Sequence, residues 1–295
     1  MNALLNQTKL WTAVITPFNE VGSEIDYASL EILCRIQAKF GIGILVAGST
    51  GEGLSLSLDE RKSLLKFVLA LKLPVPIMAG VPAHNWMEAK AWMEFCDGLP
   101  LQAHLMTTPM YTKPGVQGQT NWFQNLLNMS HVPCMLYNIP GRTGIKLFPE
   151  TIKNLSPHKN LWAIKDSSGS IESVVDYLEV QAGVQVYCGD DYLMPAMSAE
   201  GACGLVSVLS NVWPEQTKKY VEESLSGKVQ HNKIWWRATK ALFSASNPVP
   251  AKALLKHIGQ IQHATVRLPL SLEDLKSFAP LSQANDEMQS WKGSL

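Results

Sequence analysis

The sequence predicts an α/β fold, a (β/α)8 TIM barrel with a C-terminal helical appendage. Short apolar runs recur at a steady spacing, helix-period segments separate most of them, and the chain turns helical after the last run. The eight runs expected to be strands are residues 11–15, 42–47, 75–79, 103–106, 134–137, 161–165, 184–188 and 203–208. Because these runs show no polar face, a parallel sheet covered by helices is expected. Eight units of about 30 residues match a closed barrel better than an open sheet.

The helices expected between the strands are residues 27–40, 57–71, 85–96, 117–128 and 170–181, where apolar residues return every three or four positions. Ser57 stands three residues before Glu60, the spacing of a capping box, and Pro149 with Glu150 marks another helix start. A doubly wound sheet is the alternative fold. It would usually show a glycine-rich phosphate turn after the first strand, and residues 16–19 read Thr-Pro-Phe-Asn instead.

From Trp213 onward the pattern is helical, with helices expected at residues 215–225, 229–242 and 251–258. The last of these follows Pro248 and Pro250 and is stopped by Gly259. We therefore expect a barrel domain at residues 1–228 and a helical domain at residues 229–295.

The composition excludes several classes of partner. Lys plus Arg and Asp plus Glu are balanced at 25 each among 295 residues, and 46% of the residues are hydrophobic. A nucleic-acid groove or an anionic membrane surface would require a basic stripe, which the sequence does not show. No apolar run approaches the roughly 20 residues of a membrane span. We expect a small-molecule partner, and binding of neither nucleic acid nor membrane.

The cysteines and histidines give no sign of a metal or disulfide framework. The five cysteines are an odd number without a Cys-x-x-Cys pair, and the seven histidines lack metal-site spacing. The N-terminal residues do not resemble a signal peptide. The sequence therefore predicts a cytoplasmic protein that uses no metal.

A lysine closes the sixth apolar run, at residues 161–165. Desolvation disfavours an ammonium group, so an amine held at Lys165 against apolar walls can lose its proton and attack a carbonyl. The simpler alternative is that this side chain reaches out to water. Neighbouring strand ends favour the first alternative, because barrel enzymes place their active sites where the strands end. Tyr137 ends the preceding run and can move protons, and Arg142 follows it as a fork for a carboxylate.

Residues 48–53, Gly-Ser-Thr-Gly-Glu-Gly, follow the second run and can present backbone N–H groups to an anion, although such loops are often only tight turns. Together these rim residues suit an aldolase acting on keto acids. The chain resembles the pyruvate-dependent class I aldolases, a family that includes dihydrodipicolinate synthases and N-acetylneuraminate lyases. The resemblance spans residues 9–269. It rests on the motifs at residues 48–52, 108–111, 137–144, 164–165, 189–191, 204–208 and 247–250.

The resemblance implies that Lys165 forms a Schiff base with pyruvate and that Tyr137 transfers protons. Thr50 and the backbone at Val206 would hold the pyruvate carboxylate. No metal or organic cofactor is implied.

Ser49 and Tyr111 would complete a relay of hydroxyl groups, with Tyr111 reaching into a neighbouring subunit of a homotetramer or homodimer. Arg142 would bind the carboxylate of L-aspartate 4-semialdehyde, which favours the 4-hydroxy-tetrahydrodipicolinate synthase branch of lysine and diaminopimelate biosynthesis. Ser49 departs from the threonine usual in the synthases but keeps the hydroxyl group.

Two alternatives stay open from the residues alone. One is another aldolase of the family, acting on N-acetylneuraminate or a 2-keto-3-deoxy sugar acid, and the other is a catalytically silent barrel that binds pyruvate. The resemblance also implies a feedback site for L-lysine, whose usual polar residues are mostly replaced here. The corresponding positions are Gly53, Leu54, Leu58, Arg61, His84, Glu88 and Met110. We expect weak or absent inhibition by L-lysine, because leucine and methionine cannot replace polar partners.

Overall fold

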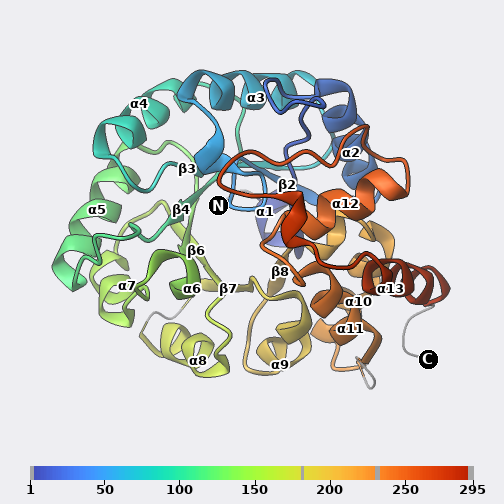
Figure 1. The fold of residues 1–295 in the computed structure, drawn as a ribbon. Coiled ribbons are helices and arrows are strands. Elements are labelled where there is room, and N and C mark those ends of the chain that lie inside the picture. The colour runs from blue at the N-terminus through green and yellow to red at the C-terminus, as the bar shows by residue number, and fades with distance from the viewer. Residues whose placement is uncertain (1–2, 181–182, 230–232, 292–295) are drawn as a thin grey trace.

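The fold is a closed barrel of eight parallel strands surrounded by helices, seen in a computed structural model that describes residues 3–180, 183–229 and 233–291 (Figure 1). The strands are β1 (Leu10–Ala13), β2 (Gly43–Val46), β3 (Ile77–Val81), β4 (Ala103–Thr107), β5 (Cys134–Asn138), β6 (Leu161–Asp166), β7 (Gln185–Cys188) and β8 (Gly204–Ser207). Each strand pairs with the next along the chain, and β8 pairs with β1 to close the barrel. The predicted (β/α)8 fold is confirmed.

Helices surround the barrel in Figure 1, except that the first one precedes β1 and its Leu5 packs into the inner core. They are α1 (Ala3–Gln7), α2 (Tyr27–Lys39), α3 (Leu58–Ala70), α4 (Trp86–Cys96), α5 (Val116–Met129), α6 (Pro140–Thr143), α7 (Pro149–Leu155), α8 (Ile171–Val180), α9 (Met194–Ala199), α10 (Pro214–Leu225), α11 (Lys233–Leu242), α12 (Val249–His257) and α13 (Ala279–Ser290). Single 3-10 turns are η1 (Gly53–Ser55), η2 (Asp191–Leu193), η3 (Leu209–Asn211) and η4 (Leu272–Asp274).

The predicted capping box is present at the start of α3. The Ser57 side chain accepts from the Glu60 backbone N–H, and the Glu60 carboxylate accepts from the Ser57 backbone N–H. Two donors that the helix itself cannot satisfy are thereby paired, which fixes where α3 begins. The predicted helix end at Gln181 and the predicted helical residues 230–232 lie outside the described residues.

Every strand differs from its predicted bounds by one or two residues at one end or both, and at β1 and β3 the cause of the difference is clear. Strand β1 ends at Ala13 rather than at Ile15, because the Ile15 backbone N–H donates to the Asn211 side chain at 3.0 Å instead of to a neighbouring strand. Strand β3 begins at Ile77, two residues later than predicted. Pro76 has no N–H for the ladder, although its carbonyl still accepts from Ile44 at 3.0 Å.

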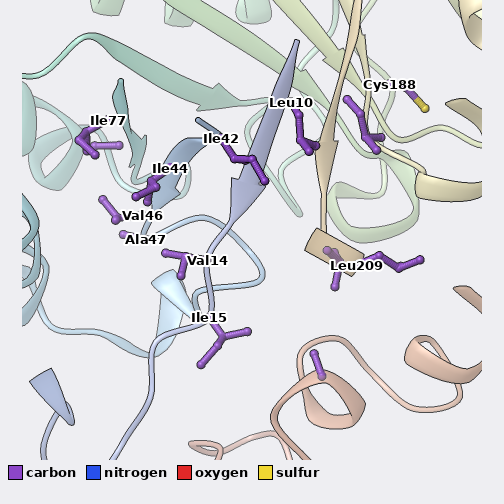
Figure 2. Packing of buried hydrophobic residues seen from close by; sticks show 14 of the residues in the cluster. Leu10, Val14, Ile15, Ile42, Ile44, Val46, Ala47, Ile77, Cys188 and Leu209 are labelled. Atoms are coloured by element: carbon purple, nitrogen blue, oxygen red, sulfur yellow. The ribbon is translucent and has the colours of Figure 1, made fainter. Parts of the chain in front are cut away.

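The apolar core has an inner and an outer part, because successive strand residues point to opposite faces of the sheet. The inner part fills the barrel with side chains such as Trp11, Met135 and Trp162. The outer part lies between strands and helices, and Figure 2 shows some of its members, including Ile44 from β2 and Ile77 from β3. Side chains fill the barrel interior, so room for a ligand is left at its ends.

The helices from α10 to α13 gather on one side of the barrel (Figure 1). The rings of Tyr220 in α10 and Trp235 in α11 stack with their centroids 4.0 Å apart, and Trp235 belongs to the outer core. The domain boundary at residue 228 stays a prediction. No helix in residues 3–180, 183–229 and 233–291 is long and apolar enough to cross a membrane.

Candidate active site

Lys165 and Tyr137 meet inside the barrel. Strands β5 and β6 are paired with these two residues opposite each other, and both side chains lie on the inward face that Met135 and Ala163 also occupy two residues earlier. Lys165 is 5% exposed and Tyr137 is 4% exposed. The lysine Nζ lies 4.1 Å from the centroid of the tyrosine ring. The Lys165 amine therefore lies over the face of the Tyr137 ring, and both side chains are shielded from water.

The amine has no carboxylate partner among the described residues, since no side chain there forms an ion pair with Lys165. Room for the side chain depends on Gly189, which follows β7. A Cβ atom at this position would lie 2.7 Å from Lys165 Cε and 2.0 Å from Ser167 Oγ. A larger residue at position 189 would therefore push directly against the lysine.

Two carboxyl groups, the buried Asp191 and the half-buried Asp190, support the strand ends beside Lys165. Asp191 accepts hydrogen bonds from the Ser207 hydroxyl and from the backbone N–H of Val208 at 3.0 Å, which fixes the end of β8. Asp190 accepts from the Gly169 backbone N–H at 3.0 Å. Burial raises the pKa of Asp190, although the Gly169 N–H and the Lys165 charge oppose this shift.

The loop after β2 carries Ser49 and Thr50. Thr50 is buried, and its Oγ1 accepts a hydrogen bond of 2.9 Å from Asn247 Nδ2. The backbone of this loop packs closely against itself, because a Cβ at Gly53 would lie 2.2 Å from the Ala47 carbonyl oxygen. Glycine at position 53 is thus required by the close approach, which explains part of the glycine-rich motif.

A cavity of about 410 Å³ opens at this end of the barrel. It lies between the ends of β2 to β5 and the segments around residues 246 and 269. The residues that line it include Ser49, Arg61, Thr107, Met110, Arg142 and Asn247. Arg142 is exposed, and its Nη2 donates to the Asn247 backbone carbonyl at 3.0 Å. The guanidinium group therefore stands at the mouth of the cavity.

The structure brings most of the predicted site residues to one end of the barrel, but not all of them. Val206 is fully buried on β8 in the inner core. Tyr111 is 92% exposed, with a left-handed backbone (φ 66°), and its backbone N–H donates to the Thr143 carbonyl at 3.1 Å. Within this single chain Tyr111 is not part of the site around Lys165.

Sequence reasoning assigned no role to Asn247, which contacts both Thr50 and Arg142. The available signal was the motif Asn-Pro-Val-Pro at residues 247–250. It is one of the motifs that carry the family resemblance, but these residue types do not by themselves indicate a chemical role. In the described part of the chain, no three His, Cys, Asp or Glu side chains are arranged to hold a metal ion.

The sequence and the fold of the whole chain are similar to those of named enzymes. The sequence is 51% identical over 288 residues to a 4-hydroxy-tetrahydrodipicolinate synthase of Wolbachia pipientis subsp. Culex pipiens, covering 98% of both chains. It is 44% identical to the enzyme of the same name from Francisella tularensis subsp. novicida, covering 96% of both.

Among solved structures, the chloride-inhibited dihydrodipicolinate synthase of Acinetobacter baumannii complexed with pyruvate matches with a TM-score of 0.90 and 29% identity, over 96% of this chain and 99% of that chain. The enzyme of Cyanidioschyzon merolae with lysine bound matches with a TM-score of 0.89 and 30% identity, over 97% and 99% of the two chains. The model of the dihydrodipicolinate synthetase family matches residues 6–283. The chain therefore belongs to the dihydrodipicolinate synthetase family.

Proposed function

We propose that the chain is a 4-hydroxy-tetrahydrodipicolinate synthase, which condenses pyruvate with L-aspartate 4-semialdehyde through a Schiff base on Lys165. The observation that carries this proposal is the buried contact between the Lys165 amine and the Tyr137 ring. The names of relatives that match over nearly the whole chain support the same reaction.

The chemistry follows from an amine and a phenol held together in a dry site. After it has given up a proton, Lys165 Nζ attacks the C2 carbonyl of pyruvate, and the carbinolamine loses water to give an iminium ion. Loss of a proton from the pyruvate methyl group gives an enamine. The enamine carbon attacks the aldehyde carbon, which restores the iminium ion and leaves an alkoxide that takes up a proton. The amino group of the second substrate then attacks the iminium carbon, which closes a ring, breaks the bond to Lys165 Nζ and returns the lysine amine. We assign these proton transfers to Tyr137, because its ring lies 4.1 Å from the amine and its hydroxyl group can both give and take a proton.

The remaining residues bind the two substrates. Thr50 and the backbone at Val206 hold the pyruvate carboxylate, and Arg142 at the mouth of the cavity receives the carboxylate of the aldehyde. Arginine suits this role because its planar, permanently charged fork matches a carboxylate.

Ser49 and Tyr111 form the relay toward solvent only in an assembly. Ser49 lines the cavity, whereas Tyr111 is 92% exposed. We propose a homodimer, or a homotetramer built from two dimers, in which Tyr111 enters the site of the partner subunit. The five free cysteines fit the reducing cytoplasm as the location of such an assembly.

Reduction with borohydride in the presence of pyruvate tests the proposal. The expected product carries one reduced pyruvate on Lys165, and the Lys165→Ala variant carries none. Purified protein is then incubated with pyruvate and L-aspartate 4-semialdehyde, and consumption of the aldehyde is measured. Adduct without turnover would identify a silent pyruvate-binding barrel. Preferential cleavage of N-acetylneuraminate or a 2-keto-3-deoxy sugar acid would identify another aldolase of the family.

A further inference from the structure

Asn247 touches both groups that the proposed function assigns to substrate carboxylates. It lies between α11 and α12, in a connecting segment, yet only 6% of it is exposed. Its Nδ2 donates to Thr50 Oγ1 at 2.9 Å, and its backbone carbonyl accepts from Arg142 Nη2 at 3.0 Å. Connecting segments usually run over the surface, so burial of a polar side chain here indicates a specific task.

The direction of the hydrogen bond to Thr50 decides what Thr50 can do. An amide nitrogen only donates, so Thr50 Oγ1 is the acceptor. A threonine hydroxyl has a single proton, and no other described residue receives it. That proton is left free to point at a ligand. With the opposite orientation of the amide, the Asn247 oxygen would take the proton and Thr50 could no longer donate to a carboxylate.

Asn247 also positions the Arg142 side chain. One of its guanidinium nitrogens is held by the Asn247 carbonyl, and a guanidinium group has five N–H donors in total. The remaining donors stay free for a carboxylate. A long side chain loses considerable conformational entropy when it binds a ligand, so holding it beforehand favours binding.

The loop that carries Thr50 is fixed to the same C-terminal part of the chain. Two residues after Thr50, the Glu52 carboxylate binds Lys252 Nζ of α12 and accepts from the Arg267 backbone N–H at 2.8 Å. The Glu52 and Lys252 side chains are 2% and 0% exposed. Thr50 is therefore held at a fixed distance from Asn247.

We propose that Asn247 is a positioning residue of the active site. It turns the Thr50 hydroxyl proton toward the pyruvate carboxylate and holds Arg142 ready for the carboxylate of the second substrate. This inference rests on the proposed function, since it assumes a carboxylate at Thr50.

A double-mutant cycle with Asn247→Ala and Thr50→Val tests the inference. The measured quantity is the pyruvate concentration that gives half-maximal borohydride trapping on Lys165, which needs no second substrate. Each single variant is expected to raise it about fivefold, the change that one neutral hydrogen bond produces. The double variant is expected to equal Thr50→Val alone, because Asn247 acts through Thr50. Ser244→Ala is the matched control, since this exposed serine of the same segment donates only back to Ala241.

Asn247→Asp gives a second measurement, independent of side-chain size. Aspartate keeps the shape but only accepts, so it takes the Thr50 proton, and pyruvate binding is expected to weaken at least as much as in Asn247→Ala. The double variant Thr50→Val/Asn247→Asp has no Thr50 proton to lose, so comparing it with Thr50→Val measures how much the new charge alone weakens pyruvate binding. Near wild-type pyruvate binding by Asn247→Asp, or additive effects in the cycle, would overturn the inference while leaving the Schiff base intact. Wild-type protein that traps no pyruvate would overturn the proposed function, and the inference with it.

Discussion

A buried ion pair ties the loop after β2 to α12. Lys252 Nζ contacts the Glu52 carboxylate, donates to the Thr265 carbonyl at 2.8 Å and lies 4.1 Å from the centroid of the Phe18 ring. Burial lowers the pKa of Lys252 to about 8, and the charge of Glu52 opposes that shift. Replacing Lys252 by methionine keeps the aliphatic stem and removes the charge. The carboxylate of Glu52 is then left with one backbone N–H, that of Arg267.

The expected loss of stability follows from the burial of both groups. Removing one partner of a buried pair typically costs about 3–5 kcal/mol, because the other charge stays buried without compensation. The entropy of unfolding is about 2.1 cal/mol/K per residue, so for 295 residues it is roughly 620 cal/mol/K. Lys252→Met should therefore lower the apparent Tm by about 5–8 °C.

Thermal unfolding at one fixed protein concentration measures this change, since the proposed assembly would make Tm depend on concentration. Lys256→Met is the matched control on the same helix. Lys256 is exposed, so its replacement should change stability by less than about 0.5 kcal/mol. The double variant Glu52→Gln/Lys252→Met removes both charges and should recover part of the loss. A Lys252→Met protein as stable as the wild type would refute the reasoning that this pair is held in a dry environment.

Four further predictions concern the site. Arg142→Ala should raise the KM for L-aspartate 4-semialdehyde about 10- to 150-fold and leave pyruvate trapping nearly unchanged, because removing a carboxylate partner costs about 1.5–3 kcal/mol. Equal losses for both substrates would contradict this. Gly189→Ala should abolish borohydride trapping, because the new Cβ would lie 2.7 Å from Lys165 Cε. The mass of the protein after reduction shows whether pyruvate has been trapped. Asp166 is fully buried, which raises its pKa to about 6. Its folded pKa exceeds its unfolded value, so the stability it contributes is present below about pH 4 and is lost as the pH rises through 6. Between pH 4.5 and pH 8 the free energy of unfolding of Asp166→Asn should therefore rise relative to that of the wild type, by at most ~3 kcal/mol, and urea midpoints measure this difference. L-lysine at about 1 mM should leave the rate unchanged in a titration, because a bound ligand would face the buried cation Arg61 in the cavity; half-inhibition below that concentration would contradict the prediction.

The sequence predicted the barrel and the central pair because both follow from local periodicity. Eight apolar runs with helices between them leave few alternatives to a closed parallel barrel. Parallel strands that are neighbours in the chain end side by side, so Tyr137 and Lys165 had to meet if both faced inward. Strand ends were less predictable. At β1 and β3 they depend on the Asn211 side chain and on the missing N–H of Pro76.

Contacts between distant parts of the chain are not marked by any local periodicity in the sequence. Asn247 and Thr50 are 197 positions apart, and Lys252 and Glu52 are 200 positions apart. An asparagine before a proline commonly marks a turn, and a lysine in a helix commonly faces water. Only the folded chain shows that both side chains are buried against the loop after β2. The role predicted for Tyr111 differs again, since it requires a second subunit and stays a prediction.

Contacts at the Lys165 amine and contacts at the substrate-binding groups should affect different kinetic constants. Tyr137 lies against the reacting amine, so its replacement removes an interaction with the changing bonds and should lower kcat. Asn247 and the Glu52 pair touch Thr50, Arg142 or their loop, and not the amine. Their loss weakens substrate and transition state alike, which raises KM and leaves kcat nearly unchanged. We therefore expect residues of the barrel strands to supply the covalent chemistry and the C-terminal segment to determine how tightly the substrates are held.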